Sequence, residues 1–543
     1  MVFARRSTPL LAAIIASCAM VLSLTACTSD NKTVVDGQTT VTSNSAGGVA
    51  VFTPSDGITL NQQTPLNKWA KLVHDLTKAL ADAGFKKGDI DHTTSDSLDK
   101  QSRAIQDFVV DHLSNNTTDD SGIAIAPDNM TLLVAPVVEA DASTRQYGDY
   151  VSQNLSTNDA TDGEATSDGE SSEDDSSKDD SSNTESDSTA SDEQAQAVDR
   201  LVSSLKLAKE SGMHVVLLGN SIEGYKPDAF VKFSDAQTIG KLQAEKMVSK
   251  LKLDKASKDN PKYIEVLLPY TAMDEKGNAN DSTFAQEAFR GIWQVLGSYY
   301  QKGVVESPSG TLDGKSTEND WQAVAYDAAK EGSTAKVLDK RLAKTDGQST
   351  LTRIDGIITM NDYIASEVVK ELDDLGYTGS AADINPQITI SGIVGNITGK
   401  KDLSRDAAPD PIKSPENDNA NDSSSSDDDA DKDTSASDKD RDSQWPLVTG
   451  YGAYVSNIPS IVNGKQWMTG MEDRQTIATD IAQACAKLNK DEALNSMPSI
   501  RNSEVGGVKK IPTINEPLLA VSAGNLKSAL IDPGYISLAD AGL

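Results

Sequence analysis

Basic side chains are scarce in this sequence, which has 50 Lys+Arg against 82 Asp+Glu and a formal net charge of −32. Contacts to phosphate require a basic surface, so this balance argues against a nucleic-acid-binding protein. Histidine is scarcer still, and its four residues are scattered without the spacing of metal ligands or of a general base: His74, His92, His112 and His214. No phosphate-binding loop, zinc motif or Ser/His/Asp arrangement is found. We therefore expect no enzyme, no cofactor and no metal site.

Cysteine is the second deficit, with three residues in the chain. Arg5-Arg6 precedes an apolar run from Leu10 to Leu24, which leads directly to Cys27 through the sequence LTAC. A basic start, an apolar stretch and small residues before a cut are typical of a secretory signal, and a cysteine after the cut is the pattern of a bacterial lipobox. We predict that residues 1–26 are removed and that lipid on Cys27 anchors the protein to the outer face of the cell membrane. A weaker match ends at Cys18. The alternative is an uncleaved membrane helix, although the run is short for a span of about 20 residues.

After such processing, one thiol remains. Cys485 lies in a helical stretch over 476–488 and has no partner in the sequence. A chain outside the cytoplasm with a single thiol is held together by its core, not by disulfides. We interpret Cys485 as a buried residue on an apolar helix face, in preference to a nucleophile.

The acidity is concentrated in two Ser/Asp-rich segments. Residues 158–193 carry a net charge of −13 and residues 414–443 carry −8, out of −32 for the whole chain. This composition cannot bury enough apolar surface to offset chain entropy, so we predict two disordered loop inserts. A specific calcium site would instead need a loop of defined spacing with a glycine turn. Residues 27–46 are rich in Thr, Ser, Asn and Asp, and they are predicted to form a flexible tether.

Elsewhere, short apolar runs alternate with stretches in which apolar residues recur at helical spacing. This alternation predicts parallel sheets covered on both faces by helices, an α/β fold, and its two series predict two doubly wound, Rossmann-like lobes. In such sheets ligands bind beyond the carboxyl ends of the strands. The expected strands are 48–52, 130–136, 214–218, 263–268, 304–306, 356–359 and either 387–392 or 447–449; the expected helices are 66–83, 101–113, 198–210, 236–251, 282–296, 323–342, 364–375 and 476–488.

Three stretches resemble the xylose-type and multiple-sugar-binding members of the type I periplasmic binding proteins, the solute-capturing components of sugar ABC transporters. They are FVKFSD with GKLQA over 230–244, GIITMND at 356–362, and the tail 511–535. The first is similar to the family's crossover into its second lobe. The resemblance implies two hinged lobes that close over a small polar ligand, here a carbohydrate. The implied organisation is an N-terminal lobe at 47–232, a C-terminal lobe at 233–474, and a helix and tail that return across the hinge at 475–543.

The resemblance also implies which residues contact the ligand. Lys68 and Trp69 stand where the family has a basic residue and a tryptophan, Trp321 stands at another ligand-facing tryptophan, and Asn361-Asp362 matches an Asn-Asp pair directly after a strand. The full set of expected ligand-binding residues is Lys68, Trp69, Asn220, Trp321, Asn361, Asp362 and Tyr451.

Several of these residues also have a structural interpretation. Trp69 and Trp321 could cover the core, and Asn361-Asp362 could cap the helix that begins there. The remaining tryptophans are interpreted as packing residues: Trp293, Trp445 and Trp467.

The chain also departs from the family's pattern at three charged positions. Gly219-Asn220 replaces an Asp-Arg pair, Gly450-Tyr451-Gly452 lacks a carboxylate, and Met471-Glu472-Asp473 has an anion in place of a cation. Charge-assisted hydrogen bonds contribute roughly 1.5–3 kcal/mol each, so these losses weaken binding of a pentose or hexose. Tyr451 offers a ring on which a different or larger ligand could stack.

Two functions follow from these observations. The first is a lipid-anchored, monomeric solute-binding protein that delivers a carbohydrate to a membrane permease of an ABC importer. The alternative is a surface sensory or interaction lipoprotein that keeps the lobes without feeding a transporter, which the lost charged anchors and the acidic inserts favour.

Overall fold

The computed structural model describes residues 32–35, 38–41, 46–56, 65–115, 125–138, 144–150, 153–156, 185–273, 280–343, 351–381 and 445–543. The chain divides into residues 1–45 and residues 46–543. Three predicted features lie outside the described residues: the signal with Cys27, the insert 414–443, and the alternative strand 387–392.

The first unit contains a β-hairpin. Strand β1 (Lys32–Val35) pairs antiparallel with β2 (Gln38–Val41). The intervening sequence is Asp36-Gly37, the dipeptide most strongly associated with two-residue hairpin turns, and Thr and Val favour the flanking strands. Residues 32–35 and 38–41 of the predicted tether, 27–46, thus pair as a hairpin.

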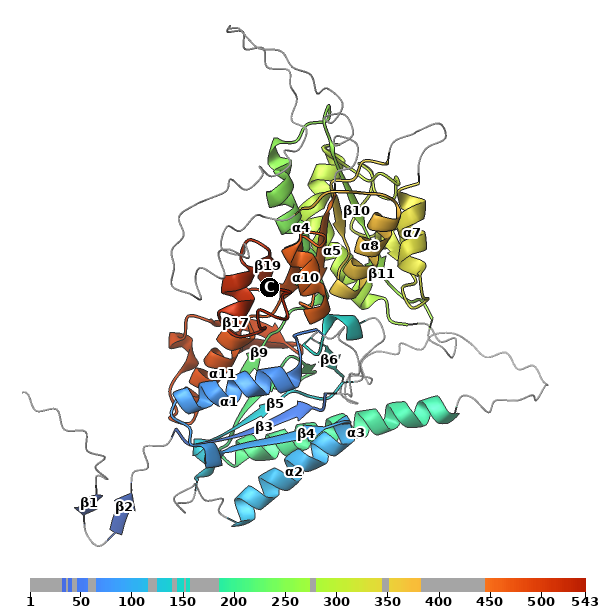
Figure 1. Ribbon diagram of the computed structural model, residues 1–543. Coiled ribbons are helices and arrows are strands. Elements are labelled where there is room, and N and C mark those ends of the chain that lie inside the picture. The colour runs from blue at the N-terminus through green and yellow to red at the C-terminus, as the bar shows by residue number, and fades with distance from the viewer. Residues whose placement is uncertain are drawn as a thin grey trace, which may run out of the picture. The chain divides into compact units, whose positions relative to one another are not determined.

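The second unit contains two large sheets, and the first of them forms what we call the N-terminal lobe (Figure 1). Its seven strands run in the order β17-β18-β9-β7-β5-β3-β4, all parallel except for β17 at one edge. The strands are β3 (Gly48–Pro54), β4 (Ile90–Ser95), β5 (Met130–Val134), β7 (His214–Leu218), β9 (Ala229–Val231), β17 (Ile500–Val505) and β18 (Val508–Ile514).

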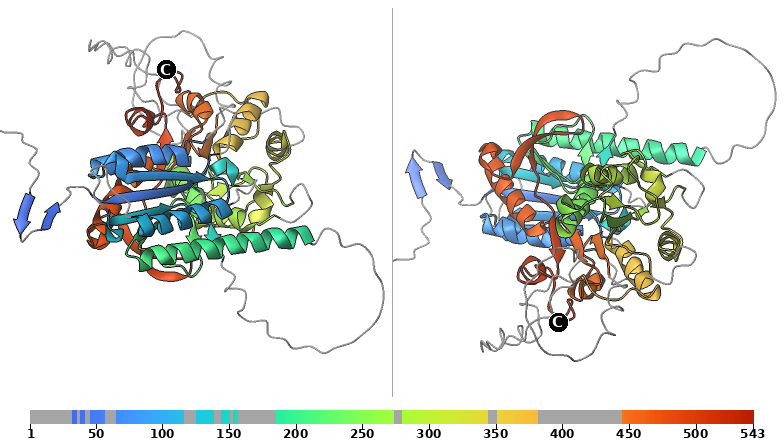
Figure 2. Two further views of the ribbon diagram at one scale, coloured as in Figure 1. Left: turned by 90° about the horizontal axis from the view of Figure 1, so that it is seen from below. Right: turned by 90° about the horizontal axis from the view of Figure 1, so that it is seen from above.

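Helices cover both faces of this sheet (Figure 2). They are α1 (Trp69–Asp82) and α11 (Arg474–Leu488) on one face, and α2 (Leu98–Asn115) and α3 (Glu185–Glu210) on the other. Successive side chains of a strand point to opposite faces, so Val49 and Val51 pack with α1 and α11 whereas Ala50 and Phe52 pack with α2 and α3. Cys485 of α11 is fully buried in the first of these clusters, as predicted.

The second sheet forms the C-terminal lobe. Its six strands run in the order β12-β10-β14-β15-β16-β19, parallel except for β19 at one edge. The strands are β10 (Lys262–Val266), β12 (Val305–Glu306), β14 (Gly356–Ile358), β15 (Leu447–Tyr451), β16 (Met468–Met471) and β19 (Leu519–Ser522). Helices α4 (Ala236–Leu251) and α5 (Thr283–Gln301) share one core cluster with this sheet, and α7 (Ser333–Arg341) and α8 (Asp362–Asp374) share another. The remaining short elements are β6 (Asn154–Leu155) with β8 (Ser221–Ile222), β11 (Leu268–Pro269) with β13 (Ala325–Tyr326), α6 (Trp321–Val324) and α10 (Ile458–Val462).

The two sheets have the same winding. In each, the second strand along the chain lies beside the first, and the third, fourth and fifth follow on the other side. This order defines a doubly wound sheet with a switch point between its first and third strands, where ligands bind. The predicted fold class, two doubly wound α/β lobes, is confirmed.

Three segments cross from one lobe to the other. One joins β9 to α4, one joins β16 to α11, and one joins β18 to β19. Because the chain returns, strands late in the sequence complete the sheet begun by β3. These three crossovers connect the two sheets, so a hinge motion of one lobe against the other would bend the chain at these segments.

Some local predictions were wrong for identifiable reasons. Strand β4 was not among the expected strands. It lies at a sheet edge and its side chains are polar and mostly exposed, so its sequence lacks the apolar alternation that predicts a strand. The expected helix over 323–342 is interrupted by β13, which pairs with β11, and α7 begins only after Gly332, whose φ is +68°. Helix α3 begins at Glu185, inside the predicted disordered insert 158–193, and its N-terminal part runs beyond the sheet (Figure 2). Acidic residues there favour a helix N-terminus.

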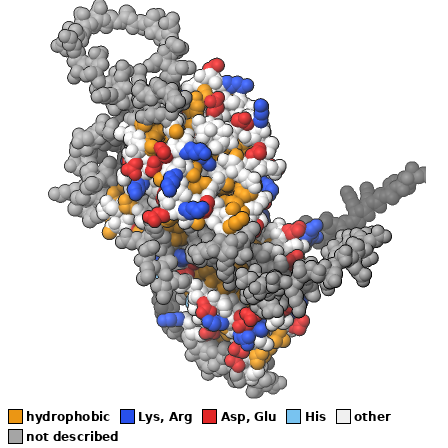
Figure 3. Space-filling model, turned by 90° about the vertical axis from the view of Figure 1, so that its right-hand side faces the viewer, with side chains coloured by type: hydrophobic (Ala, Val, Ile, Leu, Met, Phe, Trp, Pro, Cys, Tyr) orange, Lys and Arg blue, Asp and Glu red, His pale blue; other side chains and the backbone are white. Residues whose placement is uncertain are grey.

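Within the described residues, no helix is long and apolar enough to cross a membrane. On the face shown in Figure 3, acidic and basic side chains of the described residues are interspersed, without a large patch of one sign.

Candidate functional site

The two lobes meet through the residues that directly follow their strands. In the N-terminal lobe these are the segments after β3, β5 and β7, and in the C-terminal lobe they are the segments after β14, β15 and β16. Hydrogen bonds join the two sets, for example from Asn67 Nδ2 to the Tyr451 hydroxyl at 3.1 Å. The boundary between the lobes is therefore where a ligand site is expected in this fold.

Lys68 and Trp69 lie at the N-terminus of α1, where backbone N–H groups lack partners within the helix. Lys68 is the N-cap residue and its side chain does not cap the helix. Two carboxylates do so instead: Asp149 Oδ2 accepts from Trp69 N at 3.1 Å, and Asp56 Oδ2 accepts from Ala70 N at 3.3 Å. Lys68 Nζ lies 2.8 Å from Asp149 Oδ1. Burial and the neighbouring Asp149 carboxylate raise the pKa of Asp56 to about 6.

The Trp69 ring is enclosed by other rings. It is 3% exposed and contacts Tyr150 edge-on at 5.1 Å and Phe233 edge-on at 5.8 Å between ring centroids. Tyr150 in turn stacks on Phe233 at 4.8 Å. The Trp69 ring is thus buried by packing in this conformation, which agrees with the structural alternative for Trp69.

Asn220 follows β7 and holds two other loops. Its Oδ1 accepts from Gln153 N at 2.9 Å, and its Nδ2 donates to the Pro136 carbonyl at 2.9 Å. The preceding Gly219 has φ +71°, a conformation that glycine adopts without strain. Asn220 therefore positions the segments that follow β5.

Asn361 and Asp362 begin α8 and differ in their surroundings. Asn361 Oδ1 accepts from Ile364 N at 2.9 Å, which is an N-cap, while its Nδ2 donates to Gln146 Oε1 of the other lobe at 3.1 Å. The helix cap and the contact across the lobe boundary thus coincide in one side chain.

The Asp362 carboxylate is fully buried and receives three hydrogen bonds. Its Oδ2 accepts from Tyr454 N and Thr469 Oγ1, both at 2.9 Å, and its Oδ1 accepts from Gln466 Nε2 at 2.7 Å. Burial nonetheless raises its pKa to about 6. Asp362 holds the loop after β15 against β16, and its oxygens are already occupied by protein donors.

Tyr451 links both lobes to the hinge. It is 1% exposed, and its hydroxyl accepts from Asn67 and donates to Glu472 Oε1 at 3.3 Å. Glu472 Oε1 also accepts from Ser234 N at 2.8 Å. Glu472 and Ser234 lie in two different crossovers, so their hydrogen bond joins these crossovers. Glu472 is the residue that stands where the family has a cation. Burial raises the pKa of both Glu472 and Tyr451.

Trp321, at the start of α6, packs in the core cluster of the C-terminal lobe that also contains Tyr451. It contacts Tyr270 edge-on, with ring centroids 5.2 Å apart, and is 9% exposed. The tryptophans predicted to be packing residues are all buried: Trp293, Trp445 and Trp467.

The segment Thr144–Tyr150, which we call the bridging segment, contacts most of the predicted site residues and was not singled out in the sequence. It follows β5 at the switch point of the N-terminal lobe. From it, Asp149 and Tyr150 bind the start of α1, Gln146 binds Asn361, and Tyr147 packs near Tyr451. A pair of tyrosines in an otherwise polar loop at a switch point was the signal that could have found it.

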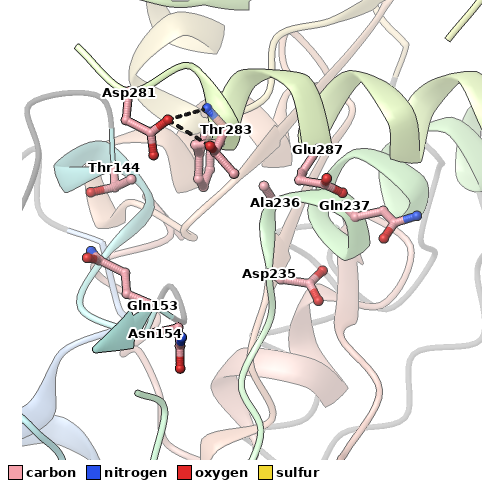
Figure 4. Close-up of a pocket in the computed structure, with 10 residues that line it drawn as sticks. Thr144, Gln153, Asn154, Asp235, Ala236, Gln237, Asp281, Thr283 and Glu287 are labelled. Carbon is pink, nitrogen blue, oxygen red and sulfur yellow. Dashed lines mark hydrogen bonds between the residues drawn. The ribbon is translucent and has the colours of Figure 1, made fainter. Parts of the chain in front are cut away.

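A cavity of about 460 Å³ opens beside the bridging segment, between the lobes (Figure 4). Residues from the N-terminal lobe lie on one side of it, and the starts of α4 and α5 lie on the other. It is lined by Thr144, Gln153, Asn154, Asp235, Ala236, Gln237, Asp281, Thr283, Phe284 and Glu287. Amides, carboxylates and one aromatic ring make this lining suitable for a polar solute. None of the seven predicted ligand residues is among them.

Among the comparisons with known proteins, only the comparison with solved structures finds similar proteins. No protein-family model and no curated protein sequence matches the chain. An ABC transporter solute-binding protein from Clostridium phytofermentans, with bound β-D-glucose, is 17% identical with a TM-score of 0.44, over 91% of this chain and 99% of that one. A carbohydrate transporter solute-binding protein from Chloroflexus aurantiacus, in complex with D-glucose, is 18% identical with a TM-score of 0.43, over 92% and 98%. A periplasmic ribose ABC transporter protein from Conexibacter woesei is 13% identical with a TM-score of 0.42, over 90% and 96%. By their names, these are components of solute or sugar transporters.

Proposed function

We propose that this protein is an extracytoplasmic solute-binding protein that captures a carbohydrate between its two lobes and delivers it to the permease of an ABC importer. The observation that carries the proposal is the meeting of polar side chains from both doubly wound sheets at the carboxyl ends of their strands, beside a cavity of about 460 Å³. Small-molecule sites occupy clefts of about 300–1,000 Å³ in this position of α/β folds.

The chemistry of the cavity supports a hydroxyl-rich ligand. Gln153 and Asn154 offer both donors and acceptors, Asp235 and Asp281 offer acceptors, and Phe284 offers a ring. Sugars present hydroxyls at their rim and apolar C–H groups on their faces, so they need this combination.

The first prediction concerns ligand binding. We expect one or more members of a panel of mono- and oligosaccharides to raise the melting temperature of the purified protein, since a ligand that binds the folded state stabilises it. Phe284→Ala should weaken binding of the ligand found by about tenfold or more, because Phe284 is the aromatic ring that lines the cavity and an aromatic platform contributes on the order of 1–2 kcal/mol.

A deletion of residues 158–184, which leaves α3 whole, is the matched control and should bind as the parent protein does. If no sugar in a broad panel changes the melting temperature, the carbohydrate assignment is wrong. Unchanged affinity in Phe284→Ala would show that the ligand does not bind in this cavity.

The second prediction concerns the lipid anchor, which rests on the lipobox ending at Cys27. In the producing bacterium, the parent protein should fractionate with membranes and Cys27→Ser should be released in water-soluble form, since two or three acyl chains give stable anchoring. Cys18→Ser is the control and should stay with the membrane. If Cys27→Ser incorporates labelled fatty acid as the parent protein does, the lipid is not at this residue.

A second function, a sensory or interaction lipoprotein, is favoured by one observation: the bridging segment fills the centre of the lobe boundary. The two functions differ in their dependence on a transporter. A solute-binding protein should stimulate ATP hydrolysis by a reconstituted permease and ATPase encoded beside it, in the presence of its sugar. Sugar binding without any stimulation would support the sensory function.

A further inference from the structure

We propose that the bridging segment, Thr144–Tyr150, is a built-in occupant of the ligand site: it holds the two lobes together without ligand and must move before a hydroxyl-rich ligand can contact Lys68, Asn361 and Tyr451. This inference rests on the proposed function, because it assigns a form of regulation to the same site.

The bridging segment is bound to the N-terminal lobe through the start of α1. Asp149 accepts from Trp69 N and pairs with Lys68, and the Tyr150 hydroxyl donates to the Lys68 carbonyl. Asp149 N also donates to the Asn67 carbonyl at 2.9 Å. Two of the residues contacted in this way, Lys68 and Trp69, are residues that the sequence assigned to a ligand.

The same segment is bound to the C-terminal lobe through side chains after β14 and β15. Gln146 Oε1 accepts from Asn361 Nδ2, and the Gln146 carbonyl accepts from the Tyr454 hydroxyl at 2.7 Å. The Tyr147 ring is 1% exposed and lies 4.7 Å from Phe284 and 6.2 Å from Tyr451, measured between ring centroids. The Tyr147 ring, from a segment of the N-terminal lobe, is thus buried in the core of the other lobe.

The chemistry of these contacts matches that of a bound solute. The segment offers an amide, a carboxylate, a hydroxyl and a flat ring to partners in both lobes, just as a sugar would offer hydroxyls and an apolar face. A ligand that used the same partners would compete with the segment, and both could not occupy them together. The cavity next to Thr144 gives a solute access to this edge of the boundary (Figure 4).

Two features indicate that the segment is docked and is not an optimised part of either core. Among the described residues, the buried Tyr147 hydroxyl makes no well-formed hydrogen bond and interacts only weakly with the Asn361 side chain, which is costly for a buried polar group. Gly148 has φ +97°, and an added Cβ would lie 2.7 Å from the Asn67 Cβ and carbonyl oxygen. The segment therefore fits against Asn67 only with glycine at this position.

This geometry provides sharp variants for a test that needs no ligand. Tyr147→Ala removes the ring from the C-terminal lobe, and Gly148→Ala forces the segment away from Asn67. Gly224→Ala is the matched control, since Gly224 lies in the same lobe at φ +69° with nothing within 4 Å of an added Cβ. Gln146→Ala is a milder variant at a partly exposed position.

The distance between the lobes is read by spin labels on Asp107→Cys of α2 and Asp374→Cys of α8, which are both exposed, in the full chain carrying Cys18→Ser and Cys27→Ser, where the remaining Cys485 is buried. Circular dichroism and the melting temperature first establish that each variant is folded.

Without sugar, we expect one short distance between the labels for the parent and for Gly224→Ala. We expect a second, longer distance in Tyr147→Ala and Gly148→Ala, and a smaller population of it in Gln146→Ala. The inference is overturned if all of them give the distance distribution of the parent, or if the parent is itself open.

Sugar binding then separates this inference from the proposed function. The apparent dissociation constant is divided by the competent fraction, so freeing the site should tighten sugar binding by about tenfold in Tyr147→Ala relative to Gly224→Ala. Opened lobes in the variants with no sugar bound by any protein would uphold the occupant and refute the carbohydrate function. Equal sugar affinity in the parent and in the variants would uphold the function and refute the occupant.

Discussion

Asp362→Ala is expected to lower the free energy of unfolding by about 3–5 kcal/mol, because each buried donor left without an acceptor costs about 1–3 kcal/mol. The substitution leaves Tyr454 N, Thr469 Oγ1 and Gln466 Nε2 without their acceptor in a fully buried place. Urea unfolding measures the loss. Asp374→Ala, at an exposed position on the same helix, is the control and should change stability by less than about 0.5 kcal/mol.

The pH dependence of this loss identifies the carboxylate as its source. Burial raises the pKa of Asp362 from 3.8 to about 6, so its contribution to stability is fully present below pH 4 and declines as the pH rises through 6. The decline amounts to about 3 kcal/mol, since each pKa unit corresponds to about 1.4 kcal/mol. The cost of Asp362→Ala should therefore be larger at pH 4 than at pH 7. A cost that is independent of pH would show that Asp362 acts by packing alone.

This role of Asp362 shows what the sequence could and could not predict about the site. The Asn-Asp pair after a strand was recognised as a candidate for both capping and ligand contact. Asn361 does cap α8, and it also reaches the other lobe, as the position after a parallel strand suggests. Which donors surround Asp362 depends on Gln466 and Thr469, about a hundred positions away, and no local pattern encodes that contact.

The fold was more predictable than the site, because periodicity is local. Alternating apolar strands and amphipathic helices were sufficient to predict two doubly wound lobes, and α4 begins and ends at the expected residues. Strands β17, β18 and β19 were not predicted: they have mixed burial, and their places are set by pairing with a lobe begun much earlier in the chain. The same reason applies to the bridging segment, whose partners lie in both lobes.

The structure shows what the residues do at the three charged positions where the sequence departs from the family's pattern. A ligand-free site with several unpaired charges would be open to water, whereas a site that packs on its own segment requires groups that can be buried. Tyr451 and Glu472 satisfy each other, and Asn220 holds the loops that follow β5. At these positions the residues present are thus engaged by groups of the protein itself.

Glu472→Ala is expected to lower the free energy of unfolding by about 2–4 kcal/mol, because it leaves two buried donors without an acceptor. These are Ser234 N, in the crossover from β9 to α4, and the Tyr451 hydroxyl. The carboxylate joins two crossovers, so its loss should also loosen the hinge. Hydrogen exchange of the Ser234 amide should accelerate together with the loss of stability measured by urea unfolding.

Two further variants test the hydrogen bonds separately from the volume of the side chain. Glu472→Gln keeps an acceptor of the same size, so its loss should be limited to about 1 kcal/mol. Glu492→Ala removes an exposed glutamate that pairs with Lys487 at 2.9 Å, and exposed pairs contribute about 0–1 kcal/mol. If Glu472→Gln costs as much as Glu472→Ala, the acceptor is not what the crossovers require. Because burial raises the pKa of Glu472, the cost of either substitution should be larger at low pH, where the carboxyl group is neutral in both the folded and the unfolded state, than at pH 7.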